Sequence, residues 1–207
     1  IGLIDGVSYM QYIVPGLVMM AIITSAYSNV SSSFFGLKFQ KSIDELVISP
    51  MPHVLVLLGF VLGGVARGLL VGLIVTIIAL CFTHLQVLHI GIMLSVAVLS
   101  AFMFALAGFL NALYAKKFDD VMLVPTFILT PLTYLGGVFY SINMLPGFWQ
   151  KISLLNPIPY LVNAFRFGVF GISDIKVAYA FFLIVIVTAV LFFVCWRLLW
   201  RGYGIRS

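Results

Sequence analysis

Five long apolar stretches, nearly free of charged residues, fill most of this chain of 207 residues. The hydrocarbon core of a bilayer is about 30 Å thick, so a helix that crosses it needs about 20 apolar residues. The stretches are too uniformly apolar for barrel strands, which alternate over about ten residues. The sequence therefore predicts an all-α polytopic membrane protein. We expect five transmembrane helices, near residues 8–35, 54–82, 90–115, 121–141 and 176–199.

The distribution of charge predicts the orientation of these helices. Only 8% of the residues are charged, against about a quarter in soluble domains, and many of the Lys and Arg residues lie in residues 36–53, residues 116–120 and the C-terminal tail. Loops rich in Lys and Arg usually face the cytoplasm. We therefore expect a cytoplasmic C-terminus and an external N-terminus. Because the chain starts with Ile1 rather than Met, we also expect a further helix before it.

Several features argue against chemistry within the chain itself. It contains no G-x-x-x-x-G-K-[ST] phosphate loop and no H-E-x-x-H motif, and no Asp or Glu lies in the middle of an expected span, where ion-coupled transporters usually carry one. We expect no catalytic residues, no metal site and energy from another polypeptide. A channel or secondary transporter without an ATPase is the alternative, and a structural scaffold is a third class.

The net charge of +5 gives no reason to expect nucleic acid as a partner. The cations lie at helix ends, where anionic lipid attracts them, and no basic stripe alternates with aromatic residues. Membrane lipid is the expected partner of these charges.

The loop at residues 36–53 contains the most informative local sequence. Ser42 and Glu45 have the spacing of a capping box, in which each side chain bonds the other residue's amide. Apolar residues at i, i+3 and i+4 follow, and Pro50 ends the helix because proline lacks an amide proton. We expect about two turns of amphipathic helix at the cytoplasmic membrane surface. It is either a simple elbow between two spans or a docking helix for a cytoplasmic partner.

Residues 40–50 resemble the cytoplasmic loop of the permease subunits of ABC type-2 exporters. A second segment is similar to the last external segment of that family: residues 131–140, then Leu145-Pro146 and Trp149, then residues 156–160 and Arg166. The resemblance covers essentially the whole chain. It implies a single transmembrane domain over residues 1–207, truncated at its N-terminus, from a family with six spanning helices.

The resemblance also implies how the protein works. The family exports substrates across the bacterial inner membrane as a homodimer of permeases, and separate cytoplasmic ATPase subunits bind the ATP and Mg²⁺, so no cofactor is expected in this chain. The short helix would be the coupling helix that contacts the ATPase. Its expected contact residues are Gln40, Lys41, Ser42, Asp44, Glu45, Leu46 and Pro50.

The external stretch at residues 142–175 is too interrupted by proline to cross the membrane. We expect two short helices there, with Trp149 and Tyr160 at the depth of the lipid headgroups, where amphipathic rings usually lie. In the family such helices close the outer mouth of the path, so Trp149, Tyr160 and Arg166 are candidate gate residues. Arg166 either holds that gate or extends to lipid phosphate.

Two expected helices carry candidate path residues. Ser25 and Asn29 lie on one face of the first helix, together with Ser28 and Ser32, and a polar face in lipid should turn inward. Alternatively, each Ser bonds back to a carbonyl one turn earlier and lines nothing. The helix at residues 121–141 offers Thr126, Thr130 and Tyr134, and the family places both helices at the central cavity of the dimer.

The second expected span carries a ridge of small residues and one charge. Gly64, Gly68 and Gly72 allow close helix packing, either within one copy or between two. Arg67 lies beside this ridge, and a charge at this depth marks a functional site by default. Its candidate partners are carbonyl groups, Asn111 or a residue of a preceding helix.

Overall fold

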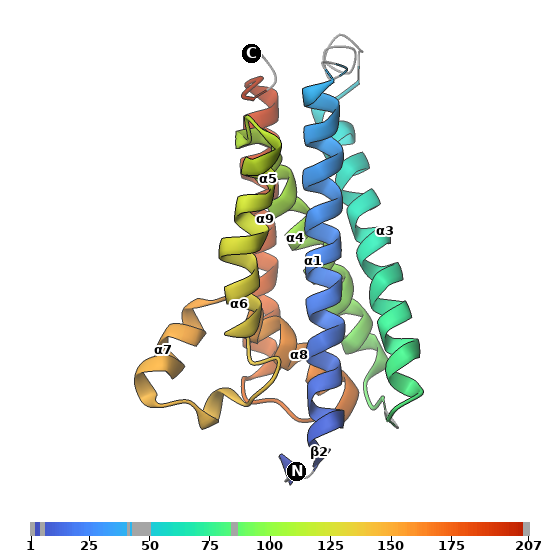
Figure 1. Ribbon diagram of the computed structural model, residues 1–207, viewed down its shortest axis with the longest axis vertical. Helices are drawn as coiled ribbons and strands as arrows, with labels where there is room; N and C mark the ends of the chain where they lie inside the picture. The colour runs from blue at the N-terminus through green and yellow to red at the C-terminus, as the bar shows by residue number, and fades with distance from the viewer. Residues whose placement is uncertain (1–2, 5–6, 41, 43–50, 84–86, 205–207) are drawn as a thin grey trace.

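The computed structural model describes residues 3–4, 7–40, 42, 51–83 and 87–204. Within these ranges, four helices are long and apolar enough to cross a membrane. They are α1 (Tyr9–Phe39), α3 (His53–Leu80), α4 (Ile90–Tyr114) and α9 (Val177–Trp200). Figure 1 shows them along the long axis of the molecule, with the C-terminus at one end of the bundle and the N-terminus at the other. The long apolar helices expected at residues 8–35, 54–82, 90–115 and 176–199 are thus confirmed.

Local sequence explains where these helices begin and end. A short antiparallel pair of strands, β1 (Leu3–Ile4) and β2 (Val7–Ser8), precedes α1. The Ser8 hydroxyl accepts a hydrogen bond from the Gln11 amide (3.4 Å), and the Ser8 amide donates to Gln11 Oε1 (3.1 Å), which completes a capping box. At the far end of α1, Lys38 Nζ donates to the Leu113 and Ala115 carbonyls (3.0 and 2.8 Å) and so satisfies the last turn of α4.

The span expected at residues 121–141 is divided. It consists of α5 (Phe118–Val124), the π-helical turn η1 (Pro125–Leu129) and α6 (Thr130–Tyr134). Pro125 has no amide proton to donate to the Val121 carbonyl, and Asn111 Nδ2 donates to that carbonyl instead (3.1 Å). The Pro125 carbonyl accepts from both the amide and the hydroxyl of Thr130 across the π-helical turn. The helical segment is about 25 Å long and ends in a turn at Gly137 (φ 70°). A fifth spanning helix therefore stays a prediction.

The stretch at residues 142–175 contains the two short helices that the sequence predicts. After the 3₁₀ turn η2 (Ile142–Met144) come α7 (Gly147–Leu155) and α8 (Ile158–Phe170). Figure 1 shows α7 projecting to one side of the bundle. By contrast, α8 is almost wholly buried and packs against α1, α4 and α9.

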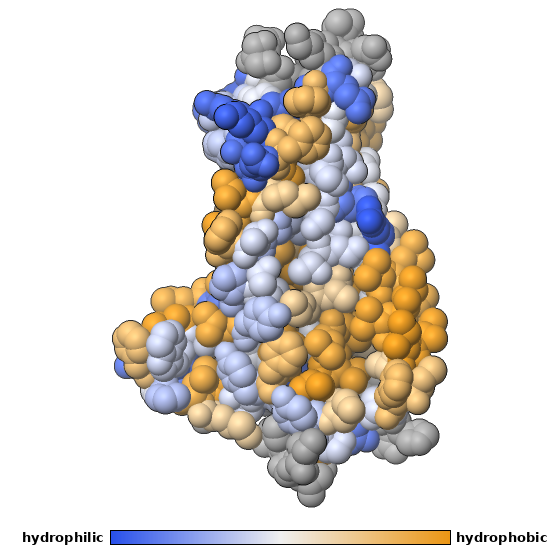
Figure 2. Space-filling view, in the orientation of Figure 1, coloured by the Kyte–Doolittle hydropathy of each residue, from blue (hydrophilic) through white to orange (hydrophobic). Residues whose placement is uncertain are grey.

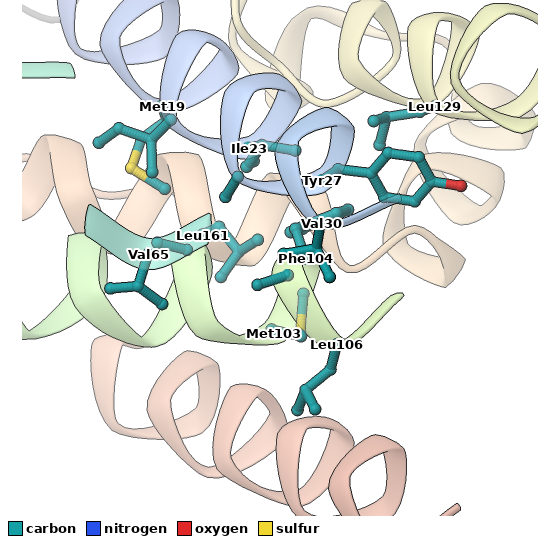
Figure 3. Close-up of a cluster of buried hydrophobic side chains, with 14 of the residues drawn as sticks. Met19, Ile23, Tyr27, Val30, Val65, Met103, Phe104, Leu106, Leu129 and Leu161 are labelled. Atoms are coloured by element: carbon teal, nitrogen blue, oxygen red, sulfur yellow. The ribbon is translucent and has the colours of Figure 1, made fainter. Parts of the chain in front are cut away.

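The core lies where α1 packs against α3 and α4. Figure 3 shows buried side chains from these helices, with Leu161 of α8 and Leu129 of η1 beside them. The predicted glycine ridge of α3 contacts α1: a Cβ at Gly68 would lie 2.9 Å from Ala26 Cβ, and one at Gly64 would overlap Val30. The ridge thus serves packing within one copy of the chain.

The predicted coupling helix falls mostly on residues that lie outside the described ranges. These include Lys41, Asp44, Glu45, Leu46 and Pro50. Of the expected contact residues, Gln40 forms the C-cap of α1, and Ser42 lies in a turn two residues later. Both lie at the end of the bundle that carries the C-terminus (Figure 1).

Candidate functional site

A polar groove of about 390 Å³ lies between α1 and α3, and it brings together polar residues from these two helices. The predicted path residues Ser25 and Asn29 line it together with Arg67. The full lining set is Ala21, Thr24, Ser25, Ser28, Asn29, Ser32, Arg67 and Val71. Figure 2 shows this face as pale over α1, with a hydrophilic patch at mid-height over α3 and hydrophobic residues below it.

The glycine ridge explains why the groove exists. Gly64 and Gly68 bring the α3 backbone against Ile22, Ala26 and Val30 of α1. The faces of α1 and α3 beside this contact therefore also lie close to each other. On α1 that neighbouring face carries the polar residues, which recur at the spacing of one helix face. On α3 it carries Arg67.

The polar residues of the groove differ in how they are bonded. The Thr24 hydroxyl donates to the Met20 carbonyl and the Ser32 hydroxyl to the Ser28 carbonyl, each at 2.7 Å. These two follow the local alternative, in which a hydroxyl bonds back one turn. Within the described part of the chain, the side chains of Ser25, Ser28 and Asn29 have no such bond. Their donors are therefore available to the groove.

Arg67 lies at the midpoint of α3, about 20 Å from either end. Its side chain is exposed, and it makes no hydrogen bond or ion pair with any other residue that the structure describes. The partner considered from sequence, Asn111, instead donates its side-chain amide to the Val121 carbonyl (3.1 Å). A guanidinium at the centre of a bilayer costs about 3 kcal/mol or more, so this side chain should face a cavity rather than lipid.

The other predicted path residues do not line this groove. Thr126 and Tyr134 are exposed, and Thr130 is bonded to the Pro125 carbonyl. Tyr134 stacks on Phe139 with ring centroids 5.6 Å apart. Because α5 and η1 contact α1, these residues flank α1 on the side away from α3 (Figure 1).

A second polar site surrounds Arg166, at the end of the bundle that carries the N-terminus. The side chain is 2% exposed. Nη1 donates to the Tyr12 hydroxyl and Nη2 to the Gly137 carbonyl, each at 2.9 Å, and the guanidinium lies 3.8 Å from the centre of the Tyr12 ring. Arg166 therefore joins α8, α1 and the turn after α6. This burial rules out the alternative in which it extends to lipid phosphate.

Three further hydrogen bonds connect α6, α8 and the loops beside the turn. Asn156 Nδ2 donates to the Leu132 carbonyl (2.6 Å), and the Ser141 hydroxyl donates to Asp174 Oδ2 (3.0 Å). The Asp174 amide donates to Asn163 Oδ1 (3.2 Å). Sequence reasoning missed these residues and Tyr12. In the sequence these residues stand out only as polar residues within apolar segments, and this does not show which residue each one bonds.

The two aromatic candidates for the outer gate differ in exposure. Trp149 is exposed on α7, as expected of a ring at the lipid surface. Tyr160 is 7% exposed, and its hydroxyl donates to the Leu154 carbonyl (2.8 Å), so it holds α7 to α8. Among the described residues no three His, Cys, Asp or Glu side chains group as metal ligands.

Comparison with known proteins places this architecture in a family. The ABC-2 type transporter family matches residues 1–170. The inner membrane transport permease YadH of Escherichia coli (strain K12) is 53% identical over 208 residues, covering 100% of this chain and 81% of that protein, and the YadH of Shigella flexneri gives the same values. Nodulation protein J of Rhizobium meliloti (strain 1021) is 21% identical over 167 residues, which are 80% of this chain and 64% of that protein. The chain therefore belongs to the ABC-2 type transporter family, as a membrane permease subunit that carries no ATPase domain and no cofactor of its own.

Proposed function

We propose that this chain is the permease of an exporter in the bacterial inner membrane, and that two copies move a substrate outward with energy from a cytoplasmic ATPase. The similarity to YadH supports the transport role and the membrane. The observation that carries the proposal is the groove, in which Arg67 at the midpoint of a spanning helix meets a polar face of α1. An open charge at that depth needs a shared cavity, and pairing two copies across this face supplies one.

The substrate path follows α1. Ser25, Asn29 and Arg67 form one wall, and Thr126, Thr130 and Tyr134 on the α5–α6 segment form the other. In a single copy Arg67, Thr126 and Tyr134 are exposed, and Ser25, Asn29 and Thr130 are half-buried. This supports the assignment, because polar side chains in a membrane protein should face protein or water.

The two ends of the bundle have different tasks in this proposal. The end that carries Gln40, Ser42 and the C-terminus faces the cytoplasm, where the coupling helix at residues 40–50 contacts the ATPase and its bound ATP and Mg²⁺. The opposite end closes the path on the outside through Trp149, Tyr160 and Arg166. Two contacts support a gate that moves with α8. Arg166 bonds α8 to α1 and to the turn at Gly137, and the Tyr160 hydroxyl fastens α7 to α8.

Co-purification tests the central claim. A cytoplasmic ATPase should purify with the permease from cells, and its ATP turnover should change when the permease is bound. Glu45→Arg should reduce the recovered ATPase at least tenfold, because it reverses a charge on the coupling helix. Lys151→Glu on exposed α7, at the other end of the bundle, is the matched charge reversal and should leave recovery unchanged. Equal recovery with both variants would refute the coupling assignment.

Leucine substitutions test the path. Asn29→Leu and Thr130→Leu should each lower ATP-driven uptake of substrate into inverted vesicles severalfold, since each removes polarity from a wall of the path. Ser33→Leu is the control, because Ser33 is exposed on α1 but does not line the groove. Gradient-driven flux by a permease purified without any ATPase would instead favour the channel or secondary transporter.

A further inference from the structure

The charge of the groove restricts the chemistry of what it can hold. Of the side chains that line it, Arg67 is charged, five are neutral and polar, and none is acidic. We infer that the groove binds the anionic oxygen group of an amphipathic substrate, a phosphate or a carboxylate, with Arg67 as its main contact. This inference rests on the proposed function and adds the substrate class to it.

The donors in the groove match an oxyanion. A guanidinium has five N–H donors in a planar fork that fits two oxygens of a phosphate or carboxylate. Opposite it, Ser25, Ser28 and Asn29 lie on one face of α1, and their hydroxyl and amide donors are not used by other described residues. Each of these groups can donate to an anionic oxygen. The groove volume of about 390 Å³ falls within the range of about 300–1,000 Å³ usual for ligand sites.

The depth of Arg67 points to a bound anion rather than to a resting lipid headgroup. Arg67 is at the midpoint of α3, whereas lipid phosphates lie beyond the edge of the hydrocarbon core, about 15 Å from its centre. A phosphate that reaches Arg67 must therefore enter the protein. Such an anion would neutralise a guanidinium that has no acidic neighbour in the groove.

The surface beside the groove accounts for the amphipathic part of the inference. Leu70 and Ile74 follow Arg67 on the same side of α3 and are 60% and 55% exposed. Figure 2 shows this lower half of α3 as a continuous hydrophobic area next to the hydrophilic patch. A substrate with an apolar portion can lie along it while its anionic group occupies the groove.

Titration of the assembled permease with defined probes tests the inference. The permease–ATPase complex is placed in phosphatidylcholine nanodiscs and titrated with dihexanoyl phosphatidic acid, with uncharged dihexanoylglycerol and with inorganic phosphate, and binding is followed by thermophoresis. The wild-type complex should bind phosphatidic acid in preference to dihexanoylglycerol. Competition by inorganic phosphate would assign a soluble oxyanion, and its absence would assign a membrane-derived one.

Three variants identify the residues responsible. Arg67→Gln should weaken phosphatidic acid binding about ten- to a hundredfold, the usual range for losing a charged hydrogen-bonded contact, and Arg67→Lys should weaken it less. Asn29→Asp should weaken phosphatidic acid binding similarly, because the new carboxylate takes the place of the anion beside Arg67. This variant tests the site even if Arg67→Gln fails to assemble. Arg197→Gln removes an exposed arginine from the last turn of α9 and should leave the affinity for phosphatidic acid unchanged.

Two results would overturn the inference. One is equal binding of phosphatidic acid by the wild type, Arg67→Gln and Asn29→Asp. The other is no binding of phosphatidic acid by the wild type. A Ser28→Cys disulfide between copies in every nucleotide state would then show that the second copy fills the groove. The proposed function fails separately, if no ATPase purifies with the wild-type chain. Recovery of the ATPase with Arg67→Gln in the same amount as with the wild type would show that the contact with the ATPase is intact.

Discussion

Arg67 and Arg166 are both set in apolar helices of this permease, but their surroundings are opposite. Arg166 is buried, bonded to Tyr12 and Gly137 and stacked on an aromatic ring. Arg67 is exposed in a polar groove and has no partner among the described residues. The first arrangement uses a charge to join three segments of the fold. The second leaves the guanidinium of Arg67 available to a ligand, and a contribution to folding stability does not explain why a charge is there.

The sharpest test of this contrast is to remove each charge in turn. Arg166→Leu should lower the free energy of unfolding by about 2–4 kcal/mol, since it leaves the buried Tyr12 hydroxyl and Gly137 carbonyl without their donors. Arg67→Leu should change it by less than about 0.5 kcal/mol, as for an exposed site. Unfolding in mixed micelles measures both. Equal losses would mean that the two arginines have the same structural role.

A second test acts on the helix contact that places Arg67 beside α1. Gly68→Ala should destabilise by about 1–3 kcal/mol because its methyl group would overpack Ala26 and the Ile22 carbonyl, at 2.9 and 3.0 Å. Gly63→Ala is the matched control on the same helix, since a Cβ there has no neighbour within 4 Å. The Gly68 variant should also widen the groove, detectable as faster alkylation of Ser25→Cys. A neutral Gly68→Ala would contradict the close packing.

A smaller change separates the contacts of Arg166. Tyr12→Phe keeps the ring beneath the guanidinium and removes the hydroxyl that accepts from Nη1 (2.9 Å). We expect a loss of about 1–2 kcal/mol, typical of a hydrogen bond to a charged group. Tyr9→Phe, one turn earlier in α1, should change the unfolding free energy by less than about 0.5 kcal/mol. If Tyr12→Phe also changes the unfolding free energy by less than about 0.5 kcal/mol, the ring contact with Arg166 contributes to stability and the hydroxyl bond does not.

The smallest expected effect concerns Asp120, a charged residue at the end of the bundle, and measures how much its carboxylate contributes to folding stability. Asp120 Oδ2 accepts from the Lys116 and Lys117 amides (2.9 and 3.0 Å), and these bonds hold the pKa of its carboxyl below the ordinary value of 3.8. A group whose pKa is lower in the folded state contributes stability above its ordinary pKa. That contribution is lost as the pH falls through the lowered value. Thermal melts between pH 2 and 6 should show a small acid-side decrease for the wild type that Asp120→Asn lacks.

Hydropathy predicted four long helices to within a few residues, because a span of lipid thickness demands a long apolar run whatever its neighbours are. The same reasoning placed a fifth span at residues 121–141, where the structure has α5, η1 and α6 instead. Pro125 lies at the start of η1 and Pro131 at the start of α6, so both prolines lie where the helix type changes. The turn that ends the segment at Gly137 is held by Arg166, which bonds the Gly137 carbonyl, and Asn156 bonds the Leu132 carbonyl in α6. Both partners lie far along the chain from this segment.

The candidate site was predictable in parts but not as a whole. The polar face of α1 follows from helical periodicity, and Arg67 follows from the rarity of charge in a span. Their meeting depends on which helix Gly64 and Gly68 approach, and the sequence left open whether this helix belongs to the same copy or to a second one. The burial of Arg166 could not be predicted from the sequence either, because its partner Tyr12 is 154 residues away in the chain.

Gly137 imposes an evolutionary constraint on the Arg166 site. Its φ of 70° is a conformation that residues other than glycine seldom adopt, and its carbonyl accepts a hydrogen bond from Arg166 Nη2. A larger residue at position 137 would redirect that carbonyl and leave a buried cation short of an acceptor. Among orthologues, divergence at 137 should therefore be accompanied by divergence at 166, so that the two positions covary although 29 residues separate them.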